Sequence, residues 1–234
     1  MKLGRKLERV PLNKRLYEQL KQDIIECRIE FGEKLTNREL QKRFGVSSTP
    51  VRDAINRLYL DGLVEDISNS GARVITFDLK FILEVNEMLS LLCCAAVESA
   101  AHTERDALCA QLEKVMSQQE RASATDEYYH YDFLFHKAFF DSCQNTQYQK
   151  TYDRYHVLWE MLVRRPHGFD GNWKKVAVEQ HRQILHDFRT GQTKLAVEQT
   201  RAHFMHADQL FRQYMKTSPG IGPASDVQMP YRAK

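Results

Sequence analysis

Residues 36–77 read TNRELQKRFGVSSTPVRDAINRLYLDGLVEDISNSGARVITF, and this stretch decides the fold. Its start matches a capping box, in which we expect the Thr36 hydroxyl and the Glu39 carboxylate to satisfy each other's free backbone N–H groups. The short helix that begins there ends at Gly45, a residue suited to the left-handed conformation of a helix end. We expect its Leu40 and Phe44 side chains to face inward.

A second helix is expected three residues after this turn. Ser48-Thr49-Pro50 is a favourable helix start, because the missing N–H of proline costs nothing in the first turn. The apolar positions that follow at helical spacing predict its buried side, namely Val51, Ile55, Leu58 and Leu63.

Two strand-like segments follow the second helix. They are Leu63–Ile67 and Ala72–Phe77, and the turn residues Ser68-Asn69-Ser70-Gly71 separate them. This pattern predicts a β-hairpin.

An amphipathic helix is expected before the quoted stretch, over roughly Pro11–Cys27, and Phe31-Gly32 breaks it. The complete order is helix, short helix, helix, hairpin. This order is that of a winged helix-turn-helix, so we expect residues 1–77 to form a DNA-binding domain.

The rest of the chain carries helical periodicity without further strand signals. The apolar pattern recurs near residues 78–101, 104–121, 125–143, 146–164, 173–190 and 193–216. We therefore expect a mainly α protein, in which an all-α antiparallel helical bundle over 78–216 follows the winged helix-turn-helix. The tail, 217–234, contains three prolines and two glycines and is expected to be disordered.

Composition places the chain among ordinary globular proteins, with 42% hydrophobic and 28% charged residues. The longest apolar stretch, near Met88–Val97, is interrupted by Ser90 and is too short to span a bilayer. The basic N-terminus has no hydrophobic segment behind it, and the five cysteines form no C-x-x-C motif. These features predict a cytoplasmic protein with reduced thiols.

The distribution of charge and histidine separates the two halves. Residues 1–73 hold 15 lysines and arginines against 11 acidic residues, although the net charge of the whole chain is only +3. All nine histidines lie beyond residue 100. A basic front and a histidine-rich back indicate two domains with different chemistry, although so small a positive excess is a weak nucleic-acid signal.

The start of the second helix is where a helix-turn-helix reads base edges. It carries Ser47, Ser48, Thr49 and Arg52, and an arginine there can bond guanine O6 and N7 together. Further candidates for backbone or groove contacts are Arg38, Arg57, Gly71 and Arg73. The alternative is a plain helix start, with Arg52 or Arg57 paired to Asp53 or Asp61 on a solvated face.

These residues carry a family resemblance. Arg38-Glu39-Leu40, Phe44–Ser47, Thr49–Ile55, Arg57-Leu58, Asp61–Val64 and Gly71 resemble the DNA-binding domain of the GntR family of bacterial regulators. The resemblance covers nearly all of residues 10–77 and implies that Arg38, Ser47, Thr49, Arg52 and Gly71 contact DNA. Ser48 stands where the family often has arginine, so an unusual operator preference is expected.

A second constellation lies in the predicted bundle. Asp132 and His136 are four residues apart and so share one helix face, a spacing that suits two ligands of one metal ion. His181 and His203 fall among apolar positions of two further helices. Spacing alone leaves open whether these are ligands of zinc, nickel, iron or manganese or hydrogen-bonded core residues.

This region also resembles a known domain. Asp132-x-x-Phe135-His136, Asn145, His181-Arg182-x-Ile184-Leu185, and Ala196 followed by His203-Phe204 look like the FCD effector-binding domain of the FadR-type branch. The resemblance implies that Asp132, His136, His181 and His203 hold a divalent metal, which commonly binds a carboxylate effector. Leu89 and Cys93 replace a family arginine and glutamate, so the effector-binding residues stay unknown; Arg154, Arg164 and Arg165 are possible substitutes.

Three functions fit this organisation. The first is a homodimeric repressor that binds a pseudo-palindromic operator and is released by a small-molecule effector. The second is a metal-dependent enzyme that uses the bundle site, although no general base is marked and no paired Glu-x-x-His motif is present. The third is an activator with the same architecture.

Overall fold

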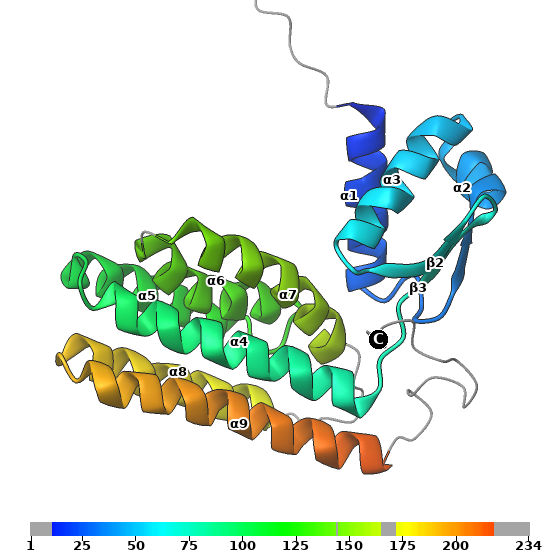
Figure 1. Ribbon diagram of the computed structural model, residues 1–234. Helices are drawn as coiled ribbons and strands as arrows, with labels where there is room; N and C mark the ends of the chain where they lie inside the picture. Colours follow the sequence, from blue (N-terminus) through cyan, green and yellow to red (C-terminus); the bar gives the residue numbers. More distant parts are fainter. Residues whose placement is uncertain (1–10, 144, 165–171, 218–234) are drawn as a thin grey trace, which may run out of the picture. The chain divides into compact units, whose positions relative to one another are not determined.

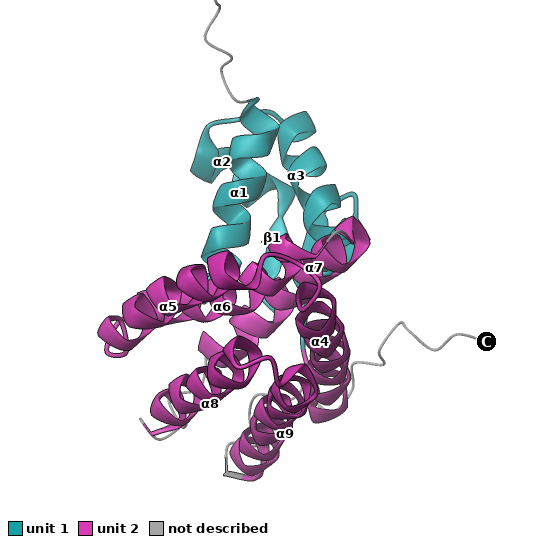
Figure 2. Cartoon of the chain, turned by 90° about the vertical axis from the view of Figure 1, so that its left-hand side faces the viewer, with its two compact units in different colours: residues 1–76 teal, residues 77–234 magenta. Residues whose placement is uncertain are grey.

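The computed structural model describes residues 11–143, 145–164 and 172–217. The chain separates into two compact units, residues 1–76 and 77–234 (Figure 2). No helix among the described residues is long and apolar enough to cross a membrane.

Unit 1 is a winged helix-turn-helix, as the sequence predicts (Figure 1). Helices α2 and α3 form the helix-turn-helix, and strands β2 and β3 form the wing. The elements in order are α1 (Leu12–Ile25), β1 (Lys34–Thr36), α2 (Asn37–Phe44), α3 (Ser48–Leu60), β2 (Val64–Ser68) and β3 (Gly71–Val74).

The sheet of unit 1 contains a strand that the sequence analysis did not predict. Strand β1 pairs antiparallel with β3 on the side opposite β2, giving the order β1-β3-β2. Three residues are too few to show the alternation of a strand. Pairing with β3, rather than local sequence, defines β1.

The expected capping box forms only in part. The Thr36 hydroxyl accepts a hydrogen bond from the Glu39 backbone N–H at 3.2 Å, as predicted. The Glu39 carboxylate instead accepts from the Thr36 hydroxyl at 2.5 Å, so its predicted bond to the Thr36 N–H is wrong. The physical reason is that Thr36 lies in β1, opposite Gly71.

The core of unit 1 joins all three helices to the sheet. Leu40 is buried as expected, whereas Phe44 is only half-buried. The Arg43 guanidinium covers the Phe44 ring, and its central carbon lies 5.0 Å from the ring centre. Buried Asp23 of α1 accepts from Arg43 of α2 at 2.7 Å and so ties these helices together. The other buried apolar residues include Leu20, Ile24, Leu35, Val51, Ile55, Leu58, Leu63 and Val74.

Gly71 lies where no other residue fits. Its φ is +144°, and a Cβ built on it would lie 1.9 Å from the Leu35 carbonyl oxygen of β1. A side chain at this position would force β1 away from β3. Gly71 is therefore what lets three strands meet at the base of the wing turn.

Unit 2 is an all-helical bundle whose helices match the six predicted segments. Helix α4 packs on α9, α5 on α6, and α8 on α9, and Figure 1 shows the first and last of these pairs lying side by side. The elements are α4 (Leu79–Ala100), α5 (Arg105–Arg121), α6 (Glu127–Ser142), α7 (Thr146–Arg164), α8 (Trp173–Arg189) and α9 (Thr193–Thr217).

Two expectations cannot be compared with the structure. The predicted disordered tail, 217–234, lies outside the described residues except for Thr217, which ends α9. The break expected between the helices predicted near 146–164 and 173–190 lies outside them as well.

Candidate nucleic-acid interface and metal centre

The N-terminus of α3 presents the residues that the sequence analysis assigns to DNA. Ser47 is the residue before the first turn and makes no side-chain capping bond. Ser47 and Thr49 are exposed, and Ser48 is half-buried. The first N–H groups of a helix have no partner within it, so at this end they can donate hydrogen bonds to a phosphate oxygen.

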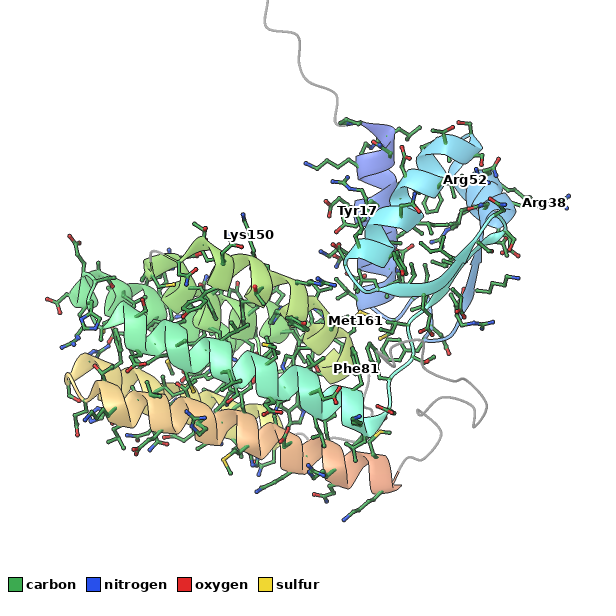
Figure 3. All side chains as sticks on the ribbon, viewed as in Figure 1. Tyr17, Arg38, Arg52, Phe81, Lys150 and Met161 are labelled. Carbon is green, nitrogen blue, oxygen red and sulfur yellow. The ribbon has the colours of Figure 1, made fainter. Side chains whose placement is uncertain are left out.

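Two arginines flank this helix start on the same side of unit 1, as Figure 3 shows for Arg38 and Arg52. Arg38 is exposed in the first turn of α2. Arg52 is exposed on α3, and its Nη2 donates to the Asn69 Oδ1 at the wing turn at 3.0 Å. Arg52 therefore stands between the helix and the wing, and the alternative in which it pairs with Asp53 or Asp61 is not what the structure shows.

Two other candidate arginines are engaged elsewhere. The Arg57 guanidinium lies over the Tyr17 ring of α1, 4.9 Å from its centre. Arg73 donates to the Gly32 carbonyl oxygen at 2.6 Å and lies 3.8 Å from an Asp66 carboxylate oxygen. These contacts engage the guanidinium groups of Arg57 and Arg73 within unit 1. Gly71 is buried in the structure, so little of its backbone is accessible to DNA.

The second site is a cluster of three histidines from three helices. His136 of α6, His181 of α8 and His203 of α9 place one ring nitrogen each within 4.8 Å of one another. The Nε2 atoms of His136 and His181 are 3.2 Å apart. His136 and His181 are buried, and His203 is half-buried.

Two glutamines fix the orientation of two of these rings. The Gln119 Oε1 accepts from His181 Nδ1 at 3.0 Å, and its Nε2 donates to Asp132 at 2.9 Å. The Gln180 Oε1 accepts from His203 Nδ1 at 2.8 Å. Because both Nδ1 atoms donate in these hydrogen bonds, Nε2 of His181 and of His203 is unprotonated and carries the lone pair that a metal would bind.

The electrostatics of the cluster favour neutral imidazoles. Burial and, to a smaller extent, neighbouring imidazoles lower the pKa of His203 to about 4 and the pKa values of His136 and His181 well below the usual value. Burial raises the pKa of Asp132 to about 7. Metal ions bind the unprotonated imidazole, so the histidines are ready for a cation at neutral pH.

The cluster fits a divalent metal. Two nitrogens bound to one ion at about 2.1 Å lie roughly 3.0 to 3.4 Å apart, and the 3.2 Å between His136 and His181 falls in this range. Asp132, the fourth predicted ligand, is 3.9 Å from His181 Nε2 and 17% exposed. The structure thus brings the three histidines together and places Asp132 beside them.

Gln119 and Gln180 are the residues that the sequence analysis missed. Gln119 follows Leu112, Val115 and Met116 on the buried face of α5 and is itself fully buried. A polar residue on an otherwise apolar helix face is a signal that could have identified it. Gln180 offers no such signal, because nothing in its local sequence distinguishes it.

A small cavity of about 40 Å³ adjoins the cluster. Asp132 and His203 line it together with three aromatic side chains, Tyr129, Trp159 and Trp173. The Arg164 guanidinium lies over the Tyr129 ring, 4.8 Å from its centre, and bonds Glu160 at 2.7 Å. Of the candidate replacements for the missing family arginine, Arg154 is exposed and Arg165 lies outside the described residues.

Leu89 and Cys93, which replace the family arginine and glutamate, are both buried in α4.

The histidines outside the cluster differ in burial. His156 is buried against the Phe133 ring, 4.3 Å away, whereas His102, His130 and His186 are exposed.

Comparison with protein families assigns both units. Residues 12–74 match the bacterial regulatory proteins of the gntR family, and residues 84–206 match the FCD domain.

Among individual relatives, the chain is 30% identical over 130 residues to the HTH-type transcriptional repressor RspR of Escherichia coli K12. The match covers 54% of this chain and 57% of RspR, so the chain spans little more than half the length of this relative. The chain is 25% identical over 201 residues to the transcriptional regulator YdhC of Bacillus subtilis 168, a match that covers 84% of this chain and 89% of YdhC.

Solved structures share the fold. Escherichia coli McbR/YncC superposes with a TM-score of 0.74 at 16% identity, over 88% of this chain and 99% of that one. Lar, which controls the expression of the Listeria monocytogenes agr system, superposes with a TM-score of 0.63 at 22% identity over the same shares.

Proposed function

The chain belongs to the GntR family of bacterial regulatory proteins, with an FCD domain C-terminal to its DNA-binding unit, and we propose that it is a repressor that a small-molecule effector releases from its operator. It is a DNA-binding transcriptional regulator and not an enzyme. The observation that carries the proposal is the histidine cluster, which lies in the helical unit C-terminal to the winged helix-turn-helix.

Residues 1–77 act in this proposal as the DNA-binding domain. Arg52 reads a base pair in the major groove, and the α3 N-terminus binds phosphate. The proposed contacts are Arg38, Ser47, Ser48, Thr49, Arg52 and Gly71. Exposure of the α3 start and of both arginines on one side of unit 1 supports this assignment.

The chain binds its operator as a homodimer in this proposal, because two half-sites related by symmetry require two recognition helices. A groove between α4 and α9 supports the proposal. It exposes the apolar side chains of Leu91 and Met205 between charges of both signs, such as Arg201 and Glu87. Exposed apolar groups with mixed charges around them are typical of contacts between protein chains.

Residues 78–216 act as the effector-binding domain. His136, His181 and His203 would hold a divalent ion (zinc, nickel, iron or manganese), and Asp132 would complete the set. When bound, such an ion supplies a Lewis-acid site for an oxygen of a carboxylate effector. Gln119 and Gln180 orient His181 and His203, and the aromatic cavity beside His203, of about 40 Å³, would have to widen to receive an effector.

Effector release requires that the ligand binds two dimer geometries with different affinity. The effector would favour a geometry whose recognition helices no longer match adjacent grooves. The direction of regulation that we propose, repression, is supported by the sequence similarity to the repressor RspR, which extends over 130 residues.

Transcription in vitro tests the direction of regulation. We expect purified protein to lower the transcript from a promoter that carries an operator selected from random DNA, and Arg52→Ala to leave the transcript unchanged. A rise in transcript with the wild-type protein would contradict repression and favour an activator. If the wild-type protein represses the promoter with the selected operator but not one with a scrambled operator, the effect depends on specific binding.

A further inference from the structure

We propose that Asn69 is a positioning residue for base recognition, because it holds the Arg52 guanidinium against the wing before DNA arrives. The proposal rests on the proposed role of Arg52 in reading a base pair. In this proposal the wing turn contributes to sequence specificity through Arg52, without contacting a base itself.

The bond between Arg52 and Asn69 joins two elements that are far apart in sequence. Arg52 Nη2 of α3 donates to Asn69 Oδ1 at 3.0 Å, across 17 residues. The two side chains line a groove of about 430 Å³ between α3 and the wing, together with Asn56 and Ile67. This bond keeps the Arg52 guanidinium on the side of unit 1 that we propose faces the DNA.

The wing turn is itself fixed to α2 by a buried residue. Asn37 is 7% exposed, and its Nδ2 donates to the Asn69 carbonyl oxygen at 2.9 Å. Its backbone N–H donates to the Ser70 carbonyl oxygen at the same distance. These two bonds hold the backbone of the turn, so the Asn69 side chain acts from a fixed position.

Serine hydroxyls within the turn stiffen it further. The Ser68 and Ser70 hydroxyl oxygens are 2.8 Å apart, and the Ser70 N–H donates to the Ser68 hydroxyl at 3.2 Å. Asparagine at a turn with such local bonds has little freedom to change its backbone conformation. The acceptor that meets Arg52 therefore belongs to a rigid element.

The Arg52 guanidinium can bond Asn69 and a guanine base at the same time. Its guanidinium carries five N–H donors, and a bidentate bond to guanine uses two of them. One donor on Asn69 leaves enough for the base. An arginine whose rotamer is already fixed loses less conformational entropy on binding, and this gain applies only when the base pair accepts its hydrogen bonds.

The test measures base discrimination rather than affinity alone. Each operator base pair is varied in turn, and Arg52→Ala identifies the pair that Arg52 reads. Asn69→Ala is expected to reduce discrimination at that same pair about fivefold, because the Arg52 side chain then loses its rotamer freedom only when it binds the base. Non-specific affinity and its salt dependence should not change, because no phosphate contact is removed.

Two further variants separate positioning from the alternatives. In the Arg52→Ala background, Asn69→Ala should have no further effect; a persisting effect would show that Asn69 contacts DNA directly and would overturn the proposal. Asn69→Asp keeps an oxygen acceptor and should preserve the discrimination ratio, although its negative charge weakens binding to every sequence.

The outcomes also distinguish this proposal from the one on which it rests. If Arg52→Ala changes discrimination and Asn69→Ala does not, only the positioning role fails. If Arg52→Ala changes discrimination at no base pair, the recognition assignment fails. Circular dichroism of each variant confirms that unit 1 is folded.

Discussion

Replacing Arg52 by alanine is expected to abolish specific binding to the operator, a loss of about 100-fold or more in affinity for the homodimer. A bidentate arginine–guanine pair contributes about 1–3 kcal/mol of discrimination, and a symmetric operator contains two such pairs. Arg52 is exposed on α3, so its truncation leaves no cavity in unit 1. Fluorescence anisotropy at moderate salt, with operator and with scrambled DNA, measures the loss.

Arg57→Ala provides the matched control for this prediction. It removes the same charge from the same helix, at a position where the guanidinium lies over Tyr17. We expect it to lower operator affinity far less than Arg52→Ala and to leave base discrimination intact. Unchanged operator affinity of the Arg52→Ala variant would show that α3 does not read DNA through this residue.

Replacing both His136 and His181 by alanine is expected to remove the bound metal, from about one divalent ion per chain to almost none. Two of the four proposed ligands are lost, and the remaining pair, His203 and Asp132, is too few to hold an ion against solvent. The wild-type protein should gain thermal stability on addition of metal, by about 2.7 kcal/mol at 100 times the dissociation constant. Elemental analysis and thermal unfolding measure both effects.

The chain offers a matched control for the metal prediction as well. His130 and His186 lie on the same two helices, α6 and α8, but are exposed. Their double replacement by alanine should leave metal content and the metal-dependent gain in stability unchanged. A wild-type protein that purifies without metal and gains no stability from zinc, nickel or manganese would contradict the assignment.

The architecture was predictable because its signals are local. The Gly45 helix end, the Ser-Thr-Pro helix start and the hairpin turn each occupy a few adjacent residues, and their order defines a winged helix-turn-helix. Strand β1 was not predictable in this way, because only its pairing with β3 makes Lys34–Thr36 a strand. The altered hydrogen bond of Glu39 follows from the same pairing.

In the candidate sites, too, local spacing predicted some features, whereas others depend on contacts that only the fold creates. Spacing placed Asp132 and His136 on one helix face, and the structure gathers His136 with His181 and His203. The bonds from Gln119 to His181 and Asp132 depend on the packing of α5 against α6 and α8, which no local pattern reveals. The bond between Arg52 and Asn69 likewise joins a helix and a turn that only the fold brings together.

The central claim is that a ligand at the metal centre controls DNA binding, and one titration tests it most directly. Operator affinity of the metal-loaded homodimer is measured by anisotropy with and without each member of a panel of small carboxylates. We predict that at least one carboxylate lowers operator affinity tenfold or more (about 1.4 kcal/mol of coupling). The effect should disappear in the His136→Ala/His181→Ala variant. An equal loss of affinity in that variant, or a panel that leaves wild-type operator affinity unchanged throughout, would contradict the account.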